Sequence, residues 1–122
     1  MKLRVKGNSI RIRLTRSEVD NFSKNGYLEE KTDFGASAFR YAIKSKEGIN
    51  GLEASFNLGK ITLYVPSAVA KEWAVNETIS YNNTIQISAD KQFFLLLEKD
   101  FKCIDNANED QSDNYENPNA VC

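Results

Sequence analysis

Residues 2–14 read KLRVKGNSIRIRL, and this stretch decides how the chain begins to fold. Apolar and cationic residues alternate in both of its runs, and Gly7-Asn8-Ser9 separates the runs with turn residues. Alternation with a period of two places the two kinds of side chain on opposite faces of a strand. The stretch therefore predicts a β-hairpin. Its apolar face would hold Leu3, Val5, Ile10 and Ile12, and its cationic face Lys2, Arg4, Lys6, Arg11 and Arg13.

The residues after this hairpin predict a helix and two more strands. Thr15 begins the helix, and Glu18, three residues on, completes a capping box. Asn25-Gly26 ends it, because glycine readily adopts the left-handed backbone that terminates helices. Residues 27–34 and 39–46 follow as strands.

The same order of elements recurs in the second half. We expect strands at 52–56 and 61–65, a helix that starts at Pro66, and strands at 84–88 and 92–98. Val69 and Trp73 would take the core face of this helix. The continuous apolar run 93–97 is typical of a central strand that is covered on both faces.

One constant offset aligns the apolar positions of the halves 1–50 and 51–102. This agreement fits a duplicated ββαββ unit, but any two strand-helix-strand units could align as well. The fold class predicted is α+β, as a curved antiparallel β-sheet or open barrel with two short helices. The offset pairs Val5 with Phe56, Ile10 with Ile61, Ile12 with Leu63, Leu14 with Val65, Phe22 with Trp73, Leu28 with Ile79, and Ile43 with Phe94.

The composition indicates one folded domain. The chain has 122 residues, of which 41% are hydrophobic and 27% charged, as in ordinary globular domains. We expect a single domain over residues 1–104 and an acidic tail over 105–122 that is docked as far as about residue 118. The start of the chain has no unbroken apolar stretch for a signal peptide. We therefore expect a cytoplasmic protein, in which disulfides are not the default.

The absence of histidine argues against most catalytic classes. It removes the commonest general base and the commonest metal ligand. No glycine-rich phosphate loop is present either, and no cofactor is expected. Whether the protein is an enzyme stays open. One interpretation is an enzyme acting on a phosphorylated small molecule in a β-sheet cavity, with Glu29, Glu30 or Glu53 as acid or base.

Charge is distributed unevenly along the chain. Residues 1–46 hold eleven Lys and Arg against five Asp and Glu, whereas residues 103–122 hold five acids and no base. We hypothesise that the tail docks on the cationic hairpin, with Phe101, Ile104 and Tyr115 as apolar anchors. Exposed ion pairs contribute only about 0–1 kcal/mol each, so these anchors would decide whether docking occurs. The alternative is a disordered end.

Four stretches carry a resemblance to a known family: GNSIRIRLTRSEV (7–19), GYLEEKT (26–32), EKDFKC (98–103) and EDQSDNYENPNA (109–120). Together they resemble a family of small bacterial proteins that is known only as a domain of unknown function. The resemblance covers nearly the whole chain and implies a cytoplasmic, single-domain protein whose tail belongs to the fold. It implies no activity, ligand or catalytic residue.

The function predicted first is a binding module that uses its cationic hairpin face. An anionic protein, a nucleotide or a nucleic acid would suit this face, because Arg binds carboxylate and phosphate through paired hydrogen bonds. Base stacking is weakly supported, since no aromatic residue is interleaved with these cations. The plain alternative is a solvated edge that discourages aggregation. No membrane is expected, and a homodimer through Tyr64, Trp73 and the strands of the second half stays open.

The tail suggests a second function, as a metal site. Two thiols and several carboxylates are ligands that Zn²⁺ accepts. The spacing is unlike that of strong zinc signatures, in which cysteines come in close pairs, because the two cysteines here lie far apart in the sequence. The candidate ligands are Cys103, Asp105, Asp110 and Cys122.

Overall fold

The computed structural model describes residues 1–101, which form two halves with the same order of elements. The first half comprises β1 (Lys2–Lys6), β2 (Ser9–Leu14), α1 (Arg16–Asn25), β3 (Tyr27–Asp33) and β4 (Ala38–Lys46). The second comprises β5 (Glu53–Asn57), β6 (Lys60–Pro66), α2 (Ser67–Glu72), β7 (Ser80–Ser88) and β8 (Lys91–Lys99). The repeated order that the sequence predicted is therefore present.

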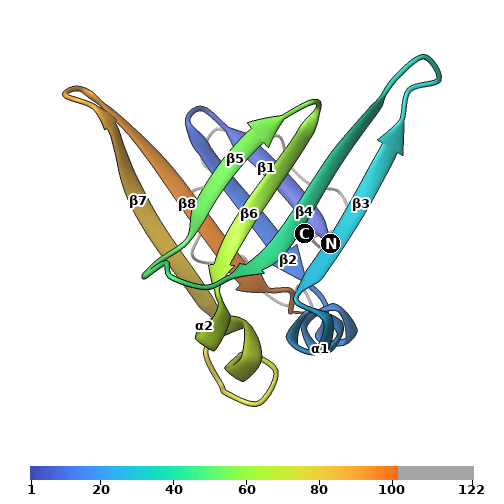
Figure 1. The fold of residues 1–122 in the computed structure, drawn as a ribbon, viewed down its shortest axis with the longest axis vertical. Coiled ribbons are helices and arrows are strands. Elements are labelled where there is room, and N and C mark those ends of the chain that lie inside the picture. Colours follow the sequence, from blue (N-terminus) through green and yellow to red (C-terminus); the bar gives the residue numbers. More distant parts are fainter. Residues whose placement is uncertain (102–122) are drawn as a thin grey trace, which may run out of the picture.

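The strands form two four-stranded sheets, each built from one hairpin of each half. Sheet A has the order β1-β2-β8-β7, and sheet B the order β3-β4-β6-β5. In Figure 1 sheet B lies in front of sheet A. The β7–β8 and β3–β4 hairpins diverge toward one end of the molecule, which we call the open end, while both helices lie at the other. Within the described residues, neither helix is long and apolar enough to cross a membrane.

The α+β class with two short helices is confirmed, and the sheets are mixed instead of antiparallel throughout. The four hairpins pair antiparallel, whereas the central pairs β2-β8 and β4-β6 are parallel. Each helix carries the chain from one sheet to the other, so strands from different halves meet at the centre of each sheet. The sheets do not close into a barrel.

Helix α1 begins and ends where its sequence predicts. The Thr15 hydroxyl accepts from the Glu18 backbone N–H, and the Glu18 carboxylate accepts from the Thr15 N–H, so the capping box is complete. Gly26 ends the helix with a φ of +72°, a backbone that glycine adopts without strain. Helix α2 begins after Pro66, which supplies no side-chain cap.

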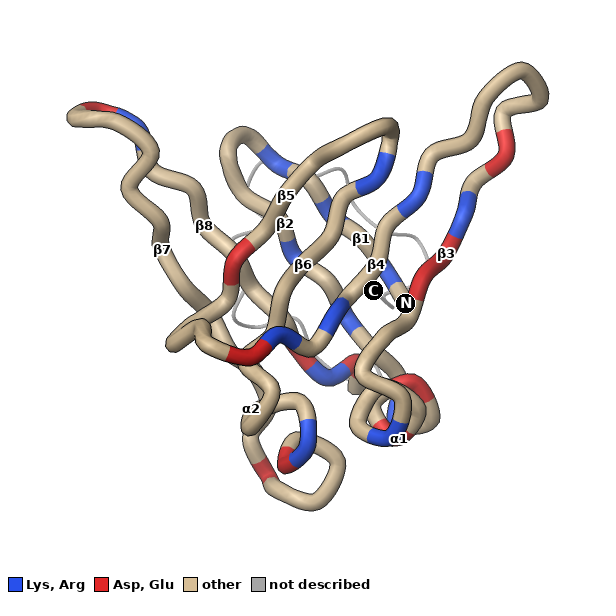
Figure 2. Tube along the Cα trace, in the orientation of Figure 1, with Lys and Arg blue, Asp and Glu red and all other residues tan. Residues whose placement is uncertain are grey.

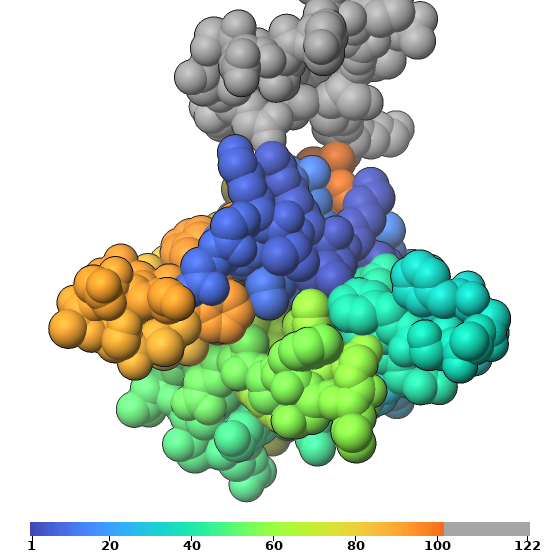
Figure 3. Space-filling model, turned by 90° about the horizontal axis from the view of Figure 1, so that it is seen from above, coloured from blue at the N-terminus to red at the C-terminus, as the bar shows by residue number. Residues whose placement is uncertain are grey.

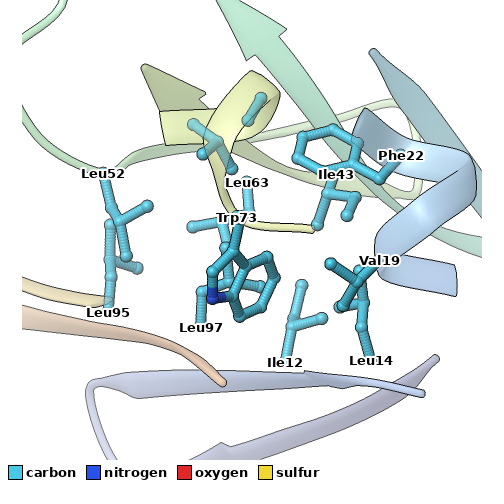
Figure 4. Close-up of a cluster of buried hydrophobic side chains, with 12 residues drawn as sticks. Ile12, Leu14, Val19, Phe22, Ile43, Leu52, Leu63, Trp73, Leu95 and Leu97 are labelled. Carbon is cyan, nitrogen blue, oxygen red and sulfur yellow. The ribbon is translucent and has the colours of Figure 1, made fainter. Parts of the chain in front are cut away.

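The core lies between the sheets and is closed at the helical end by α1 and α2 (Figure 4). Phe22 of α1 and Trp73 directly after α2 are both fully buried, and they occupy equivalent positions in the two halves. Trp73 also donates its Nε1–H to the carbonyl oxygen of Thr78 at 2.8 Å. The suggested dimer contact through Trp73 is therefore wrong, because its ring is part of the core.

Strand pairing corrects the second part of the repeat alignment. Ile12 pairs with Leu97, and Leu63, the equivalent of Ile12, pairs with Ile43. The counterpart of Ile43 is therefore Leu97 and not Phe94. Leu28 and Tyr81 are likewise equivalent, because they pair with Ile43 and Leu97, respectively. Two residues of this shift arise between helix and strand, since the stretch 67–79 that precedes β7 is two residues longer than its counterpart 16–26 before β3. The third arises within the β7–β8 hairpin, where the register is irregular between Gln86 and Ser88.

Strand β8 is central, but it is buried on one face only. It lies between β2 and β7. Leu95 and Leu97 are fully buried, whereas Phe94 on the opposite face is 39% exposed. The prediction of cover on both faces is wrong because both helices lie at the helical end and no described element lies over this side of sheet A.

The turns of the two equivalent hairpins, Gly7-Asn8 and Leu58-Gly59, differ at both positions. Gly7 of the β1–β2 turn has a φ of +53°, and Leu58 of the β5–β6 turn has a φ of +50°. A left-handed backbone costs a residue with a Cβ about 1–2 kcal/mol. Leu58 is also fully exposed, so no burial offsets that cost.

Candidate anion-binding face

The five predicted cations share one face of sheet A. Antiparallel pairing sets Lys2 opposite Arg13 and Arg4 opposite Arg11, and directly opposed side chains project from the same side of a sheet. Ile12 and Leu14 point the other way and are fully buried. Figure 2 shows the basic positions that follow one another along β1 and β2. We call Lys2, Arg4, Lys6, Arg11 and Arg13 the cationic face.

Two acids near the end of β8 lie against this face. The Glu98 carboxylate accepts from Arg13 Nε at 2.5 Å, and its Oε1 lies 3.6 Å from Arg11 Nε. Asp100 Oδ2 lies 2.9 Å from Lys2 Nζ. These pairs hold one end of the face near the end of β8. Lys6, at the other end, forms no ion pair within the described chain.

The cationic face continues into an apolar strip on β8. Parallel pairing sets Arg11 beside Leu96 and Ser9 beside Phe94, which places Phe94 and Leu96 on the outer side with the cations. Asn82 and Thr84 of β7 pair with these two residues and extend the strip with polar groups. A groove of about 230 Å³ lies at the junction of cations and strip. It is lined by Arg4, Lys6, Ser9, Ile10, Arg11, Phe94 and Leu96.

The equivalent hairpin of sheet B does not carry these charges. The repeat alignment sets Glu53, Ser55 and Asn57 of β5 in the places of Lys2, Arg4 and Lys6. Thr62 and Tyr64 of β6 replace Arg11 and Arg13 in the same way. Both β1 and β5 are edge strands. The same fold therefore forms an edge hairpin without a row of cations.

The outer side of sheet B holds a group that sequence reasoning missed. Tyr27 donates its hydroxyl hydrogen to Glu29, and Lys60 donates to both Tyr27 and Glu29. The hydrogen bond from Tyr27, followed by that from Lys60, lowers the pKa of Glu29. The bonds to Tyr27 and Glu29 raise the pKa of Lys60. Lys60 is thus already paired by its own sheet.

Aromatic rings and cations meet on this outer side of sheet B. Lys60 Nζ lies 5.3 Å from the centroid of Tyr27, and Lys46 Nζ lies 4.9 Å from that of Tyr64. In the sequence, the alternation of Tyr27, Glu29 and Lys31 along β3 indicated that these side chains share one face of a strand. Only the sheet order shows that Tyr64, distant in sequence, lies two strands away.

The structure does not bring the three candidate catalytic glutamates together. Glu29 and Glu30 are consecutive on β3 and therefore point to opposite faces of the strand. Glu53 lies on β5, at the other edge of sheet B, where its nearest cation is Lys46 at 3.7 Å. Glu30 instead accepts from the Tyr41 hydroxyl at 2.6 Å. Burial, with this hydrogen bond, raises the pKa of Tyr41 to about 12.

The candidate metal ligands Cys103, Asp105, Asp110 and Cys122 lie outside the described residues, as do the anchors Ile104 and Tyr115. Among residues 1–101, no group of three or more Cys, Asp or Glu side chains is arranged to hold a metal ion. Phe101, the third anchor, is the last described residue and is 61% exposed.

The described chain is a small α+β domain with two mixed sheets. Each sheet combines one hairpin from each repeated half, and sheet A carries a cationic outer face. The family model of DUF7009, a family of unknown function, matches residues 1–119, and the chain belongs to this family. No curated protein and no solved structure matches the chain.

Proposed function

We propose that this protein is an interaction module that binds an acidic protein segment on its cationic face. The observation that carries the proposal is the contrast between the two edge hairpins: β5 and β6 occupy the same place in the fold without the cations. Neither folding nor protection of an edge strand therefore accounts for five cations on β1 and β2. A binding surface does account for them.

The apolar strip favours a peptide over a nucleic acid. Phe94 and Leu96 lie beside Arg11 in the groove, so a ligand that combines carboxylates with apolar side chains meets both chemistries. Stacking of successive bases needs several aromatic rings, and Phe94 is the only ring on the described part of this face. We also propose a cytoplasmic location, where acidic protein segments are common binding partners.

The protein's own tail would compete for this face. It holds five acids, Asp105, Glu109, Asp110, Asp113 and Glu116, and no base. Asp100, five residues before the tail, pairs with Lys2 at one end of the cationic face, and this ion pair supports the proposal. A weakly held tail would act as a latch that an external acidic segment displaces.

The test compares two triple variants by fluorescence anisotropy with a labelled polyglutamate peptide. Arg4→Gln, Lys6→Gln and Arg11→Gln together should weaken binding by at least about tenfold, because desolvated charged contacts are worth more than exposed pairs. Lys31→Gln, Lys44→Gln and Lys46→Gln remove the same charge from sheet B and should change affinity less than about threefold. Equal losses in the two variants would show a response to net charge alone and would reject the face.

A second pair of measurements tests the ligand class and the latch. Binding of a single-stranded oligonucleotide that is tighter than that of the peptide would assign the face to nucleic acid. Replacing the five tail acids by their amides in the full chain should increase peptide affinity if the tail competes. An unchanged affinity would remove the latch from the proposal and leave the face.

A further inference from the structure

The open end of the molecule is formed by the ends of all four hairpins. Their turns lie at residues 7–8, 34–37, 58–59 and 89–90. In Figure 1 all four turns lie opposite both helices, and the β3–β4 turn reaches furthest. Figure 3 looks down on this end and shows the β7–β8 and β3–β4 hairpins at its two sides, with the other two between them. The molecule thus presents four separate projections in one direction.

Each projection carries an exposed large hydrophobic side chain. These are Val5, Phe34, Phe56, Leu58 and Ile87, five of the nine such side chains in the described chain. Between the sheets at this end lies an apolar cleft of about 430 Å³, whose lining includes Ile10, Ile61 and Phe93. No charged side chain lines this cleft. The apolar character of the tips therefore continues inward.

The Leu58 side chain is exposed at this end although its left-handed backbone is energetically unfavourable. It combines a left-handed backbone with full exposure, and Gly7 occupies the equivalent position in the other half. Asparagine or glycine would fit the turn without strain, because Asn-Gly is the favoured pair for such hairpin turns. A strained backbone that gains nothing for folding points to a function of the side chain.

Cations stand beside the tips of sheet A. Lys6 and Lys91 adjoin the turns of the β1–β2 and β7–β8 hairpins, are exposed, and form no ion pair within the described chain. Lys6 is also the end of the cationic face, so positive charge extends along sheet A from the β1–β2 tip, whereas Lys91 stands next to Asp90 of the β7–β8 turn. Apolar tips with lysines directly behind them match the order of layers in an anionic bilayer, whose phosphates overlie its acyl chains.

We propose that the open end docks on an anionic lipid bilayer, with the hairpin tips inserted at the level of the headgroups. A fluid surface accommodates each tip separately, whereas a protein partner would need a matching pocket for each of four separated projections. Such docking needs no spanning segment, and its residues are scattered along the chain, which is why a search for apolar runs does not reveal it. The proposal can be tested separately from the proposed function, because Leu58 and Phe34 do not belong to the cationic face and the two proposals share only Lys6.

The experiment is co-sedimentation of the full chain with vesicles of phosphatidylcholine, with and without phosphatidylglycerol. The wild type should sediment with the anionic vesicles. Leu58→Asn combined with Phe34→Asn should lower the partition coefficient by at least about tenfold. Leu58→Asn alone should lower it less while leaving thermal stability unchanged or higher, because asparagine before Gly59 suits the turn. Val75→Asn, at an equally exposed position near the helices, should change neither quantity.

Two results would overturn the proposal. One is a wild type that stays in the supernatant with anionic vesicles. The other is a Leu58→Asn, Phe34→Asn double variant that sediments as well as the wild type. If binding then disappears with Arg4→Gln, Lys6→Gln and Arg11→Gln, the vesicles contact the cationic face alone. That result would reject docking through the tips and would show that the cationic face itself binds anionic lipid.

Discussion

The hairpins β1–β2 and β5–β6 have similar side chains toward the core and different side chains toward solvent. Toward the core, Ile12 matches Leu63 and Leu14 matches Val65, and all four are buried. Toward solvent, the first hairpin carries five cations, whereas the second carries mostly neutral groups with Glu53 and Lys60. The fold therefore constrains the inner face at both places and leaves the outer face free to differ.

The outer faces of the two sheets also differ in how their cations are paired. Lys60 is held by Tyr27 and Glu29 within sheet B. On sheet A the acids Glu98 and Asp100 meet Arg11, Arg13 and Lys2 near the end of β8, and Lys6 at the far end has no such partner in the described chain. Lys6 therefore has no acid partner in the described chain comparable to the one that Glu29 gives to Lys60 on sheet B.

The largest predicted effect tests the likeness of the interiors. Phe22→Ala and Trp73→Ala should each lower the free energy of unfolding by about 3–5 kcal/mol, because both remove a fully buried ring from the same core. Trp73→Ala should be the more damaging, since it also leaves the Thr78 carbonyl without its donor. Urea unfolding of both variants gives the comparison. A difference much larger than the mean effect would mean that the halves are not equivalent in energy.

Much of the fold was predictable because its signals are local. The alternation in residues 2–14 predicted β1 and β2, and Thr15, Glu18 and Gly26 predicted the ends of α1. Sheet membership was not predictable in this way. The parallel pairing of β2 with β8 joins strands from opposite ends of the described chain, and no local pattern of either strand specifies its partner.

The candidate site was predictable in part for the same reason. That Lys2, Arg4, Lys6, Arg11 and Arg13 share a face follows from a period of two within one hairpin. The apolar strip and Glu98 belong to β8 and reach that face only through sheet order. The constant offset between the halves failed after the helices, because residues 73–79 join α2 to β7, whereas Gly26 alone joins α1 to β3.

A medium effect concerns the two helix starts, which lie at equivalent positions. Thr15→Ala should lower the free energy of unfolding by about 1 kcal/mol, because it leaves a backbone N–H of α1 without its cap. Pro66→Ala, at the equivalent position of the second half, removes no cap hydrogen bond and should cost about half as much or less. Thermal unfolding of the two variants measures the difference. Equal losses in the free energy of unfolding would show that the capping box adds no stability to α1.

The smallest effect concerns pH and the Tyr27–Glu29–Lys60 group on the outer side of sheet B. Because Tyr27 and Lys60 lower the pKa of Glu29, its charged form stabilises the folded state above the ordinary glutamate pKa of about 4.5, and this contribution is lost as pH falls through the lowered value. Glu29→Gln should therefore reduce the loss of stability between about pH 5 and pH 3, as measured by thermal unfolding across that range. Glu77→Gln, which removes an exposed glutamate without an ion pair in the described chain, is the control. An identical pH profile for the two variants would mean that the Tyr27–Glu29–Lys60 group does not hold Lys60 in solution. Lys60 would then be available to an external anion, and the contrast between the two hairpins would rest on the number of cations alone.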